Sequence, residues 1–114
     1  MDFKSDNIVG VHPKIMDAIV KANIGVSPSY GDDYYTKQLK TKLSEIFETE
    51  VSIYLASTGT AANSLALSAI TPPYGSIYSH INSHVNNDEC GAPELFTGGV
   101  KIVPIMGDNC KIDC

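Results

Sequence analysis

The stretch VSIYLASTGTAAN, residues 51–63, decides how this chain is interpreted. Residues 51–55 are β-branched and aromatic, which favours a strand, and small residues follow them as a turn. Residues 61–70 are rich in Ala and Leu and predict a helix. The first N–H groups of a helix lack intrahelical partners, and the helix dipole adds partial positive charge there. Because Gly59 has no Cβ, a phosphate can approach the backbone of this turn closely.

The turn itself, STGT at residues 57–60, matches no nucleotide-binding fingerprint. It lacks the Gly-Lys-Ser/Thr of a P-loop, and it has one glycine where a dinucleotide fingerprint has three. Ser57 or Thr58 is also a good helix N-cap. Two interpretations therefore stay open from these residues alone. One is a capped helix with nothing bound, and the other is a phosphate site formed by Thr58, Gly59 and Thr60.

The composition argues against several classes of partner. The chain has 114 residues, enough for one small domain, and a formal net charge of -5 from 13 acidic and 8 basic residues. All the basic residues are scattered lysines, whereas nucleic-acid binding needs a clustered basic surface. No apolar run approaches the roughly 20 residues of a membrane span, and the polar first residues do not form a signal peptide. Three cysteines without a disulfide pattern favour a reducing compartment. We expect a soluble cytoplasmic protein with no nucleic-acid and no membrane partner.

The first half of the chain predicts two helices joined by a loop. Pro13 suits the first turn of a helix, and the apolar stripe that follows ends at Asn23 and Gly25. The loop of residues 25–35 is long enough to be functional or disordered. Thr36 is predicted to cap the second helix. The face of that helix expected to be core consists of Leu39, Leu43, Ile46 and Phe47.

The second half of the chain alternates between strand and helix patterns. The predicted strands are residues 51–55, 76–81 and 100–105, with helical segments between them. This β-α-β-α-β order predicts an α/β sheet with right-handed crossovers. Ligands gather at the carboxyl ends of the strands in such sheets, where residues 57–60 and 80–84 both fall.

His80 and His84 are four residues apart, and Glu89 and Cys90 follow them. On a single helix the two imidazoles would share a face, which is one geometry for a metal. We expect a break between strand and helix to separate them, so no metal is predicted. The preferred interpretation is one exposed histidine that stacks on a ring or moves a proton, and the alternative is a surface or capping histidine. Four acidic residues are expected on exposed faces, namely Asp32, Asp33, Asp88 and Glu89.

Four motifs, in this order along the chain, resemble those of the low-specificity threonine aldolases. They are DFKSDN at residues 2–7, YGDD at 30–33, STGTAAN at 57–63, and His84 with DECGAPE at 88–94. These aldolases are pyridoxal-phosphate enzymes of the aspartate-aminotransferase-like fold. The resemblance covers essentially the whole chain and implies an α/β fold, namely the amino-terminal part of that fold's large domain. It would be an incomplete cofactor-binding domain, with an arm, helix and loop in residues 1–35 and the start of the sheet in residues 36–114.

The resemblance implies pyridoxal 5′-phosphate as the cofactor. Thr58, Gly59 and Thr60 would hold its phosphate, which agrees with the chemistry of a helix N-terminus. His84 would stack on the pyridine ring and help to handle the proton of the substrate's β-hydroxyl group. His84 is therefore both a cofactor-binding and a catalytic candidate.

The resemblance also implies the substrate and the partners. The family cleaves β-hydroxy-α-amino acids such as L-threonine into glycine and an aldehyde, so the implied partner is a small amino acid. Ser5 would touch the substrate carboxylate. Tyr30 would lie near a dimer interface and serve a neighbouring subunit's site. The complete protein would be a homo-oligomer, a dimer or a tetramer.

The chain also departs from the family's pattern. The Schiff-base lysine, the aspartate at the pyridine nitrogen and the arginines that clamp the substrate lie, in the family, beyond the point where this chain stops. Lys4 replaces the usual arginine of the arm. The family's sheet order separates residues 51–55 from 76–81, so open sheet edges and an open core are expected. We expect the chain alone to be inactive. Two alternatives stay open, a non-catalytic remnant or split-subunit binding protein, and a related pyridoxal-phosphate lyase or aminotransferase.

Overall fold

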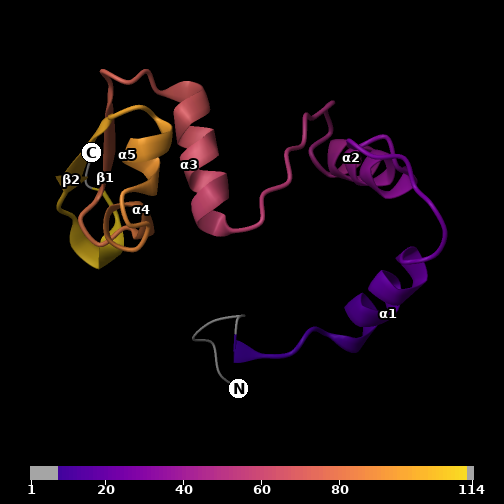
Figure 1. Ribbon diagram of the computed structural model, residues 1–114. Coiled ribbons are helices and arrows are strands. Elements are labelled where there is room, and N and C mark those ends of the chain that lie inside the picture. The colour runs from indigo at the N-terminus through magenta and orange to yellow at the C-terminus, as the bar shows by residue number, and fades with distance from the viewer. Residues whose placement is uncertain (1–7, 113–114) are drawn as a thin grey trace. The chain divides into compact units, whose positions relative to one another are not determined.

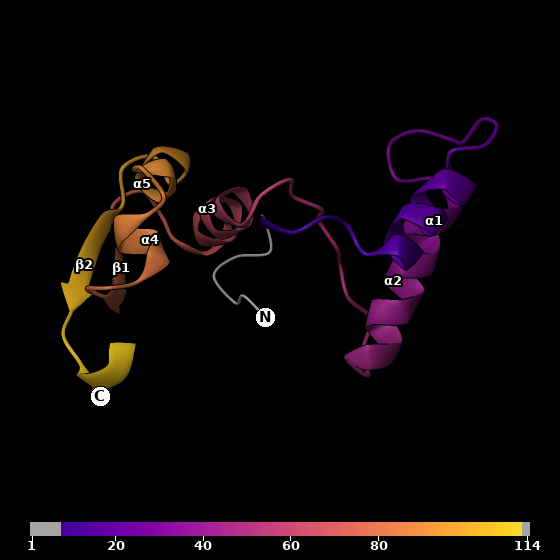
Figure 2. The same cartoon turned by 90° about the horizontal axis from the view of Figure 1, so that it is seen from below.

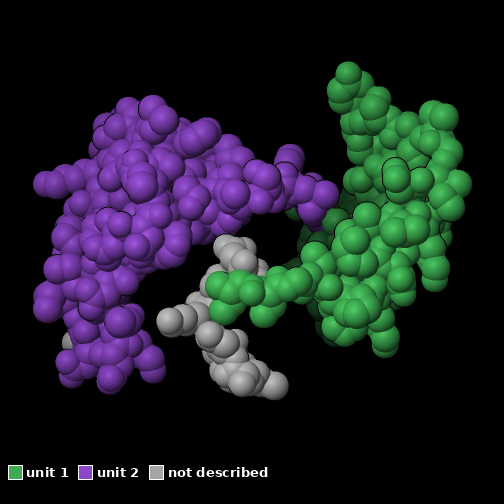
Figure 3. Space-filling view, turned by 60° about the horizontal axis from the view of Figure 1, so that its bottom comes forward, with its two compact units in different colours: residues 1–52 green, residues 53–114 purple. Residues whose placement is uncertain are grey.

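The computed structural model describes residues 8–112 of the chain. The chain divides into two compact units, Met1–Ser52 and Ile53–Cys114, which Figure 3 distinguishes by colour. Each unit is described by itself below. The division expected from the family, between residues 35 and 36, stays a prediction.

The first helix, α1, spans Pro13–Ala22, as the sequence predicts (Figure 1). Pro13 occupies the first turn, and the Nδ1 of His12 accepts a hydrogen bond from the Lys14 N–H at 3.2 Å. The helix ends at Asn23, and Gly25 follows with φ +77°, a conformation that glycine adopts at little cost. The whole of α1 is exposed, including its apolar stripe.

The second helix, α2, spans Tyr34–Ile46 and begins three residues earlier than a Thr36 cap predicts. Its N-cap is Asp33, so the prediction that Thr36 caps the helix is wrong. Thr36 instead donates its N–H to Asp33 Oδ1 at 2.9 Å and its hydroxyl to Oδ2 at 2.6 Å. A carboxylate accepts both donors at once, and aspartate is a stronger N-cap than threonine.

The predicted core face of α2 is confirmed only in part. Leu39 and Leu43 are half-buried, whereas Ile46 and Phe47 are 69% and 64% exposed. The helix itself follows from its good helix formers and its cap. Its burial depends on packing partners, which periodicity does not reveal.

The predicted strand at residues 51–55 is not formed. These residues are extended, but no backbone-to-backbone hydrogen bond joins them to any other residue that the structure describes. At the start of this segment, the Val51 N–H donates a hydrogen bond to the Ser44 hydroxyl oxygen at 3.3 Å. A strand is stabilised by its neighbouring strand, so a suitable sequence without a partner remains extended chain.

The second unit contains a two-stranded parallel sheet and helices. Its elements are α3 (Gly59–Ile70), β1 (Ser76–His80), α4 (His84–Asn87), α5 (Ala92–Phe96), β2 (Lys101–Ile105) and η2 (Asp108–Cys110). The strands pair in register from Ser76 with Lys101 to His80 with Ile105. Both lie within one residue of the predicted strands. Helix α3 packs against α5, which lies between α3 and the strands in Figures 1 and 2.

The core of the second unit is small. Val100, Pro93, Thr97 and Ser64 are buried where α3, α5 and the start of β2 meet. The Thr97 hydroxyl donates to the Pro93 carbonyl at 2.7 Å and accepts from the Val100 N–H at 3.3 Å. Large apolar side chains remain exposed, among them Tyr54, Leu55 and Ile70. This agrees with the expected open core. No helix within residues 8–112 is long and apolar enough to cross a membrane.

Candidate functional site

The N-terminus of α3 offers free donors for an anion. Thr58 is its N-cap, and its hydroxyl oxygen accepts from the Ala61 N–H at 3.1 Å while its carbonyl accepts from Ala62 at 3.0 Å. The N–H groups of Gly59 and Thr60 have no hydrogen-bond partner within residues 8–112. A Cβ on Gly59 would meet no atom within 4 Å. Two unpaired amides at a helix N-terminus fit a phosphate group.

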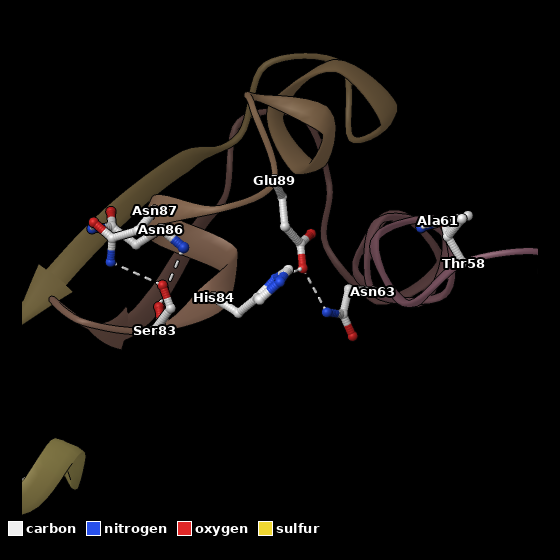
Figure 4. A network of polar contacts seen from close by, with 8 residues as sticks. All are labelled: Thr58, Ala61, Asn63, Ser83, His84, Asn86, Asn87 and Glu89. Atoms are coloured by element: carbon white, nitrogen blue, oxygen red, sulfur yellow. Dashed lines mark hydrogen bonds and ion pairs between the residues drawn. The ribbon is translucent and has the colours of Figure 1, made fainter. Parts of the chain in front are cut away.

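Glu89 joins this helix to α4 through a buried carboxylate. Its side chain has 0% exposure. The Oε1 atom accepts from Asn63 Nδ2 at 2.6 Å and lies 2.9 Å from His84 Nδ1. Figure 4 shows Asn63 reaching from α3, and His84 from α4, to this one carboxylate. The expectation that Glu89 is exposed is therefore wrong.

His84 is held on one edge and open on the other. It is the first residue of α4, whose N-cap Ser83 accepts from the Asn86 N–H at 3.3 Å. Its Nδ1 faces Glu89, while the side chain remains 63% exposed. The histidine is therefore oriented and still accessible to a ligand, as the preferred interpretation of the sequence requires.

The N-terminal turn of α3, residues 58–60, and His84 lie near the same end of this helix. Asn63 follows Gly59 by four residues, which is about 6 Å along a helix axis. Asn63 in turn contacts Glu89, and Glu89 contacts His84. The arrangement brings a helix end with unpaired amides and an accessible imidazole into one region of the second unit. Such a pair suits a ligand with a phosphate and a planar ring.

A sharp reversal of the chain directs Glu89 inward. The two residues after it, Cys90 and Gly91, both have positive φ, +51° and +76°. Gly91 is the N-cap of α5, where the left-handed conformation carries no Cβ penalty. The non-glycine Cys90 does carry such a penalty, of about 1–2 kcal/mol, which the surrounding packing must offset. The turn between α4 and α5 therefore holds the Glu89 carboxylate against Asn63 of α3.

His80 takes a different role from His84. It is 6% exposed, its Nε2 lies 2.9 Å from the Gly107 carbonyl, and its Nδ1 accepts from the Asn82 N–H at 3.0 Å. Because β1 ends at His80 and α4 begins at His84, the predicted break between them is confirmed. His80 uses both ring nitrogens to hold the segment after β1 against residue 107.

The remaining sequence candidates lie elsewhere. Tyr30 belongs to the first unit, is fully exposed and has φ +61°. Ser5 falls outside the described residues. Their assignments to the substrate stay predictions. Asp33, expected to be solvated, is half-buried as the cap of α2, so that expectation is also wrong.

Sequence reasoning placed Asn63 in a motif but missed its contact with Glu89. It lies 26 residues from Glu89, so no local spacing connects the two. A family model for the beta-eliminating lyases matches residues 2–114. The chain belongs to the beta-eliminating lyase family. That family match covers the α3 turn, Asn63, His84 and Glu89 together.

Two proteins similar in sequence to this chain are described as threonine aldolases. The chain is 41% identical over 110 residues to the low specificity L-threonine aldolase of a Pseudomonas species, covering 96% of this chain and 32% of that protein. It is 43% identical over 101 residues to the Pseudomonas aeruginosa enzyme of the same description, covering 89% and 29%. The chain thus spans about a third of the length of these relatives.

A solved structure supports the same family fold. The threonine aldolase of Leishmania major matches with a TM-score of 0.83 and 28% identity, over 91% of this chain and 30% of that one. The predicted fold class, an α/β fold shared with the pyridoxal-phosphate enzymes of this group, is confirmed.

Proposed function

We propose that this chain forms the cofactor-phosphate and ring-stacking part of a pyridoxal-phosphate-dependent threonine aldolase. The observation that carries the proposal is the α3 N-terminus, one helical turn from the Asn63–Glu89–His84 network. It occurs in a chain 41–43% identical to low-specificity L-threonine aldolases. The reaction proposed for the whole protein is cleavage of L-threonine and related β-hydroxy-α-amino acids into glycine and an aldehyde.

Thr58, Gly59 and Thr60 hold the cofactor phosphate in this proposal. The amides of Gly59 and Thr60 donate to it, and Thr58 fixes the helix start by accepting from the Ala61 N–H, which leaves both of these amides unpaired. The positive end of the helix dipole adds to their attraction for a phosphate.

His84 acts beside the ring and at the substrate's hydroxyl. Glu89 fixes one edge of the imidazole, and the exposed remainder lies against the ligand. When bound, pyridoxal phosphate supplies a pyridine ring that accepts the electron pair released as the substrate's Cα–Cβ bond breaks. His84 takes up the proton that leaves the β-hydroxyl group.

Ser5 and Tyr30 complete the proposal on the substrate side, at its carboxylate and at a neighbouring subunit's site. In this proposal the whole protein is a cytoplasmic homo-oligomer, a dimer or a tetramer. None of the eight lysines stands in the family's Schiff-base context, so we expect no acetaldehyde from the chain alone with pyridoxal phosphate and L-threonine.

The proposal is tested by titrating the ¹⁵N-labelled chain with pyridoxine 5′-phosphate. This probe has the phosphate and ring of the cofactor but lacks the aldehyde, which reacts with any lysine. We expect the Gly59 and Thr60 amide signals and the His84 ring signals to shift together and saturably. Inorganic phosphate should shift the two amides and leave the His84 ring signals unchanged. Saturable binding that leaves all of these signals unmoved contradicts the proposal.

A further inference from the structure

The Glu89 carboxylate is unusual because it is buried without a lysine against it among the described residues. Its Oε1 atom contacts Asn63 Nδ2 and His84 Nδ1, and its Oε2 atom has no partner among the described residues. Both ion pairs of lysine that the structure records lie on α2, in the other unit. The two nitrogens on Oε1 are therefore what compensates this carboxylate for its loss of water.

An ionised carboxylate can only accept hydrogen bonds. If Glu89 is ionised, the Nδ1 atom of His84, 2.9 Å from Oε1, is the atom that carries the proton of this hydrogen bond. In a neutral imidazole one nitrogen is protonated and the other is an acceptor. The contact with Glu89 therefore decides which nitrogen of His84 is left with a free lone pair.

We infer that Glu89 is a positioning residue that holds neutral His84 in its Nδ1–H tautomer, leaving Nε2 as the proton acceptor. The inference rests on the proposed function only in assigning His84 its chemical task. Nε2 lies across the ring from the atom that Glu89 engages, on the part of a side chain that is 63% exposed. Asn63 connects the same carboxylate to α3, so the ring is oriented relative to the helix that offers the free amides.

The assignment specifies the path of one proton. The O–H bond of the substrate's hydroxyl breaks, its electron pair stays on oxygen, and a new N–H bond forms at His84 Nε2. The ring is then protonated on both nitrogens and carries a positive charge beside the Glu89 carboxylate, which stabilises that charge. The imidazole ring of His84 becomes neutral again when Nε2 gives this proton back.

A purely structural role for Glu89, as a tie between α3 and α4, makes no demand on the tautomer. Long-range ¹H–¹⁵N correlation spectra of the labelled full chain separate the two roles. They are recorded at about pH 9, above the ordinary pKa of imidazole of about 6.5. For His84 we expect Nδ1 in the protonated range of ¹⁵N shifts and Nε2 in the unprotonated range.

Three variants sharpen this measurement. Glu89→Leu removes the acceptor, and the two ¹⁵N shifts of His84 should move toward each other as the tautomers mix. Glu89→Gln keeps an oxygen that accepts from Asn63 and His84, and it should restore the wild-type pattern. Asp88→Asn removes the same charge at the neighbouring, exposed position and should leave the pattern unchanged.

The wild-type spectrum decides the matter even where Glu89→Leu fails to fold. A His84 with a protonated Nε2 and a bare Nδ1, or with averaged shifts, overturns the inference. A leucine variant that folds and keeps the wild-type pattern overturns it as well. The outcome is independent of cofactor chemistry. An Nδ1–H tautomer in a chain that does not bind pyridoxine 5′-phosphate upholds this inference and refutes the proposed function. An Nε2–H tautomer in a chain that does bind pyridoxine 5′-phosphate through Gly59 and Thr60 overturns this inference and supports the proposed function.

Discussion

Asn63 donates to the buried Glu89 carboxylate at 2.6 Å across 26 residues of chain, and this contact ties α3 to the turn between α4 and α5. Asn63→Ala removes one of the two donors on a carboxylate that has no access to water. Hydrogen bonds to charged groups contribute about 1.5–3 kcal/mol, so we expect the second unit to lose stability of that order. The measurement is the urea midpoint of unfolding, followed by far-UV circular dichroism.

The matched control for this variant is Ser68→Ala on the same helix. Ser68 donates to the Leu65 carbonyl at 2.9 Å in an exposed hydrogen bond. Its loss should change stability by no more than about 0.5 kcal/mol, as is usual for surface substitutions. Equal effects of the two substitutions would refute a special role for the Asn63–Glu89 contact.

The first residue of α3 allows one amide donor to be removed with little other change. Gly59→Pro deletes the N–H, and proline fits the first helical position. Thr58 already has φ -142° and ψ 159°, the extended conformation that a residue before proline requires. We expect pyridoxine 5′-phosphate to bind about 10- to 150-fold more weakly, since a charge-assisted hydrogen bond is lost.

Gly59→Ala is the control, because it retains the N–H and adds a Cβ that meets no protein atom within 4 Å. Its affinity for the probe reports the effect of a Cβ beside the phosphate alone, and the proline variant, which also lacks the amide, should bind more weakly than the alanine variant. A proline variant that binds as tightly as the alanine variant, by equilibrium dialysis, shows that the Gly59 amide does not hold the phosphate.

Thr97 stabilises the start of β2 through its hydroxyl group rather than its methyl group. Thr97→Val keeps the shape but leaves the Val100 N–H without its partner, and the Pro93 carbonyl retains only the hydrogen bond from the Thr97 N–H at 3.0 Å. Because these groups are buried, we expect a loss of about 1–3 kcal/mol in the free energy of unfolding. Thr41→Val removes an exposed hydroxyl that donates to the Lys37 carbonyl at 3.2 Å, and it should be nearly neutral. Thermal melts of both variants test the difference, and a neutral Thr97→Val would contradict it.

Local signals in the sequence predicted the elements whose stability is local. Pro13 marked the start of α1, Thr58 capped α3 as one of two candidates, and both strands of the sheet were placed within a residue. The Asp33 cap was also readable, because an aspartate stands three residues before Thr36 and is the better cap. Sequence analysis named Thr36 as the cap and expected Asp33 on an exposed face, so the stronger capping residue was not considered.

Other features depend on residues far apart in the chain. Residues 51–55 have the composition of a strand, but strand formation requires a neighbour that composition does not specify. Glutamate is a residue type usually found on the surface. The burial of Glu89 depends on Asn63 and on the positive φ of Cys90. The helix N-terminus at residues 58–60 was therefore predictable from local residues, whereas the network that orients His84 required the fold.

The N-cap of α2 gives the helix a defined response to pH. The hydrogen bonds from the Thr36 hydroxyl and amide hold the pKa of Asp33 below its ordinary value of 3.8. A carboxyl group with a lowered pKa in the folded state stabilises that state above its unfolded pKa. This contribution is lost as the pH falls through the lowered folded value. Below about pH 4 we therefore expect the first turn of α2 to fray, with the Thr36 amide signal moving toward its random-coil shift.

Asp33→Asn keeps a capping oxygen that does not titrate, so its Thr36 signal should stay constant over the same range. A Thr36 amide that moves equally in both proteins would place the titrating group elsewhere.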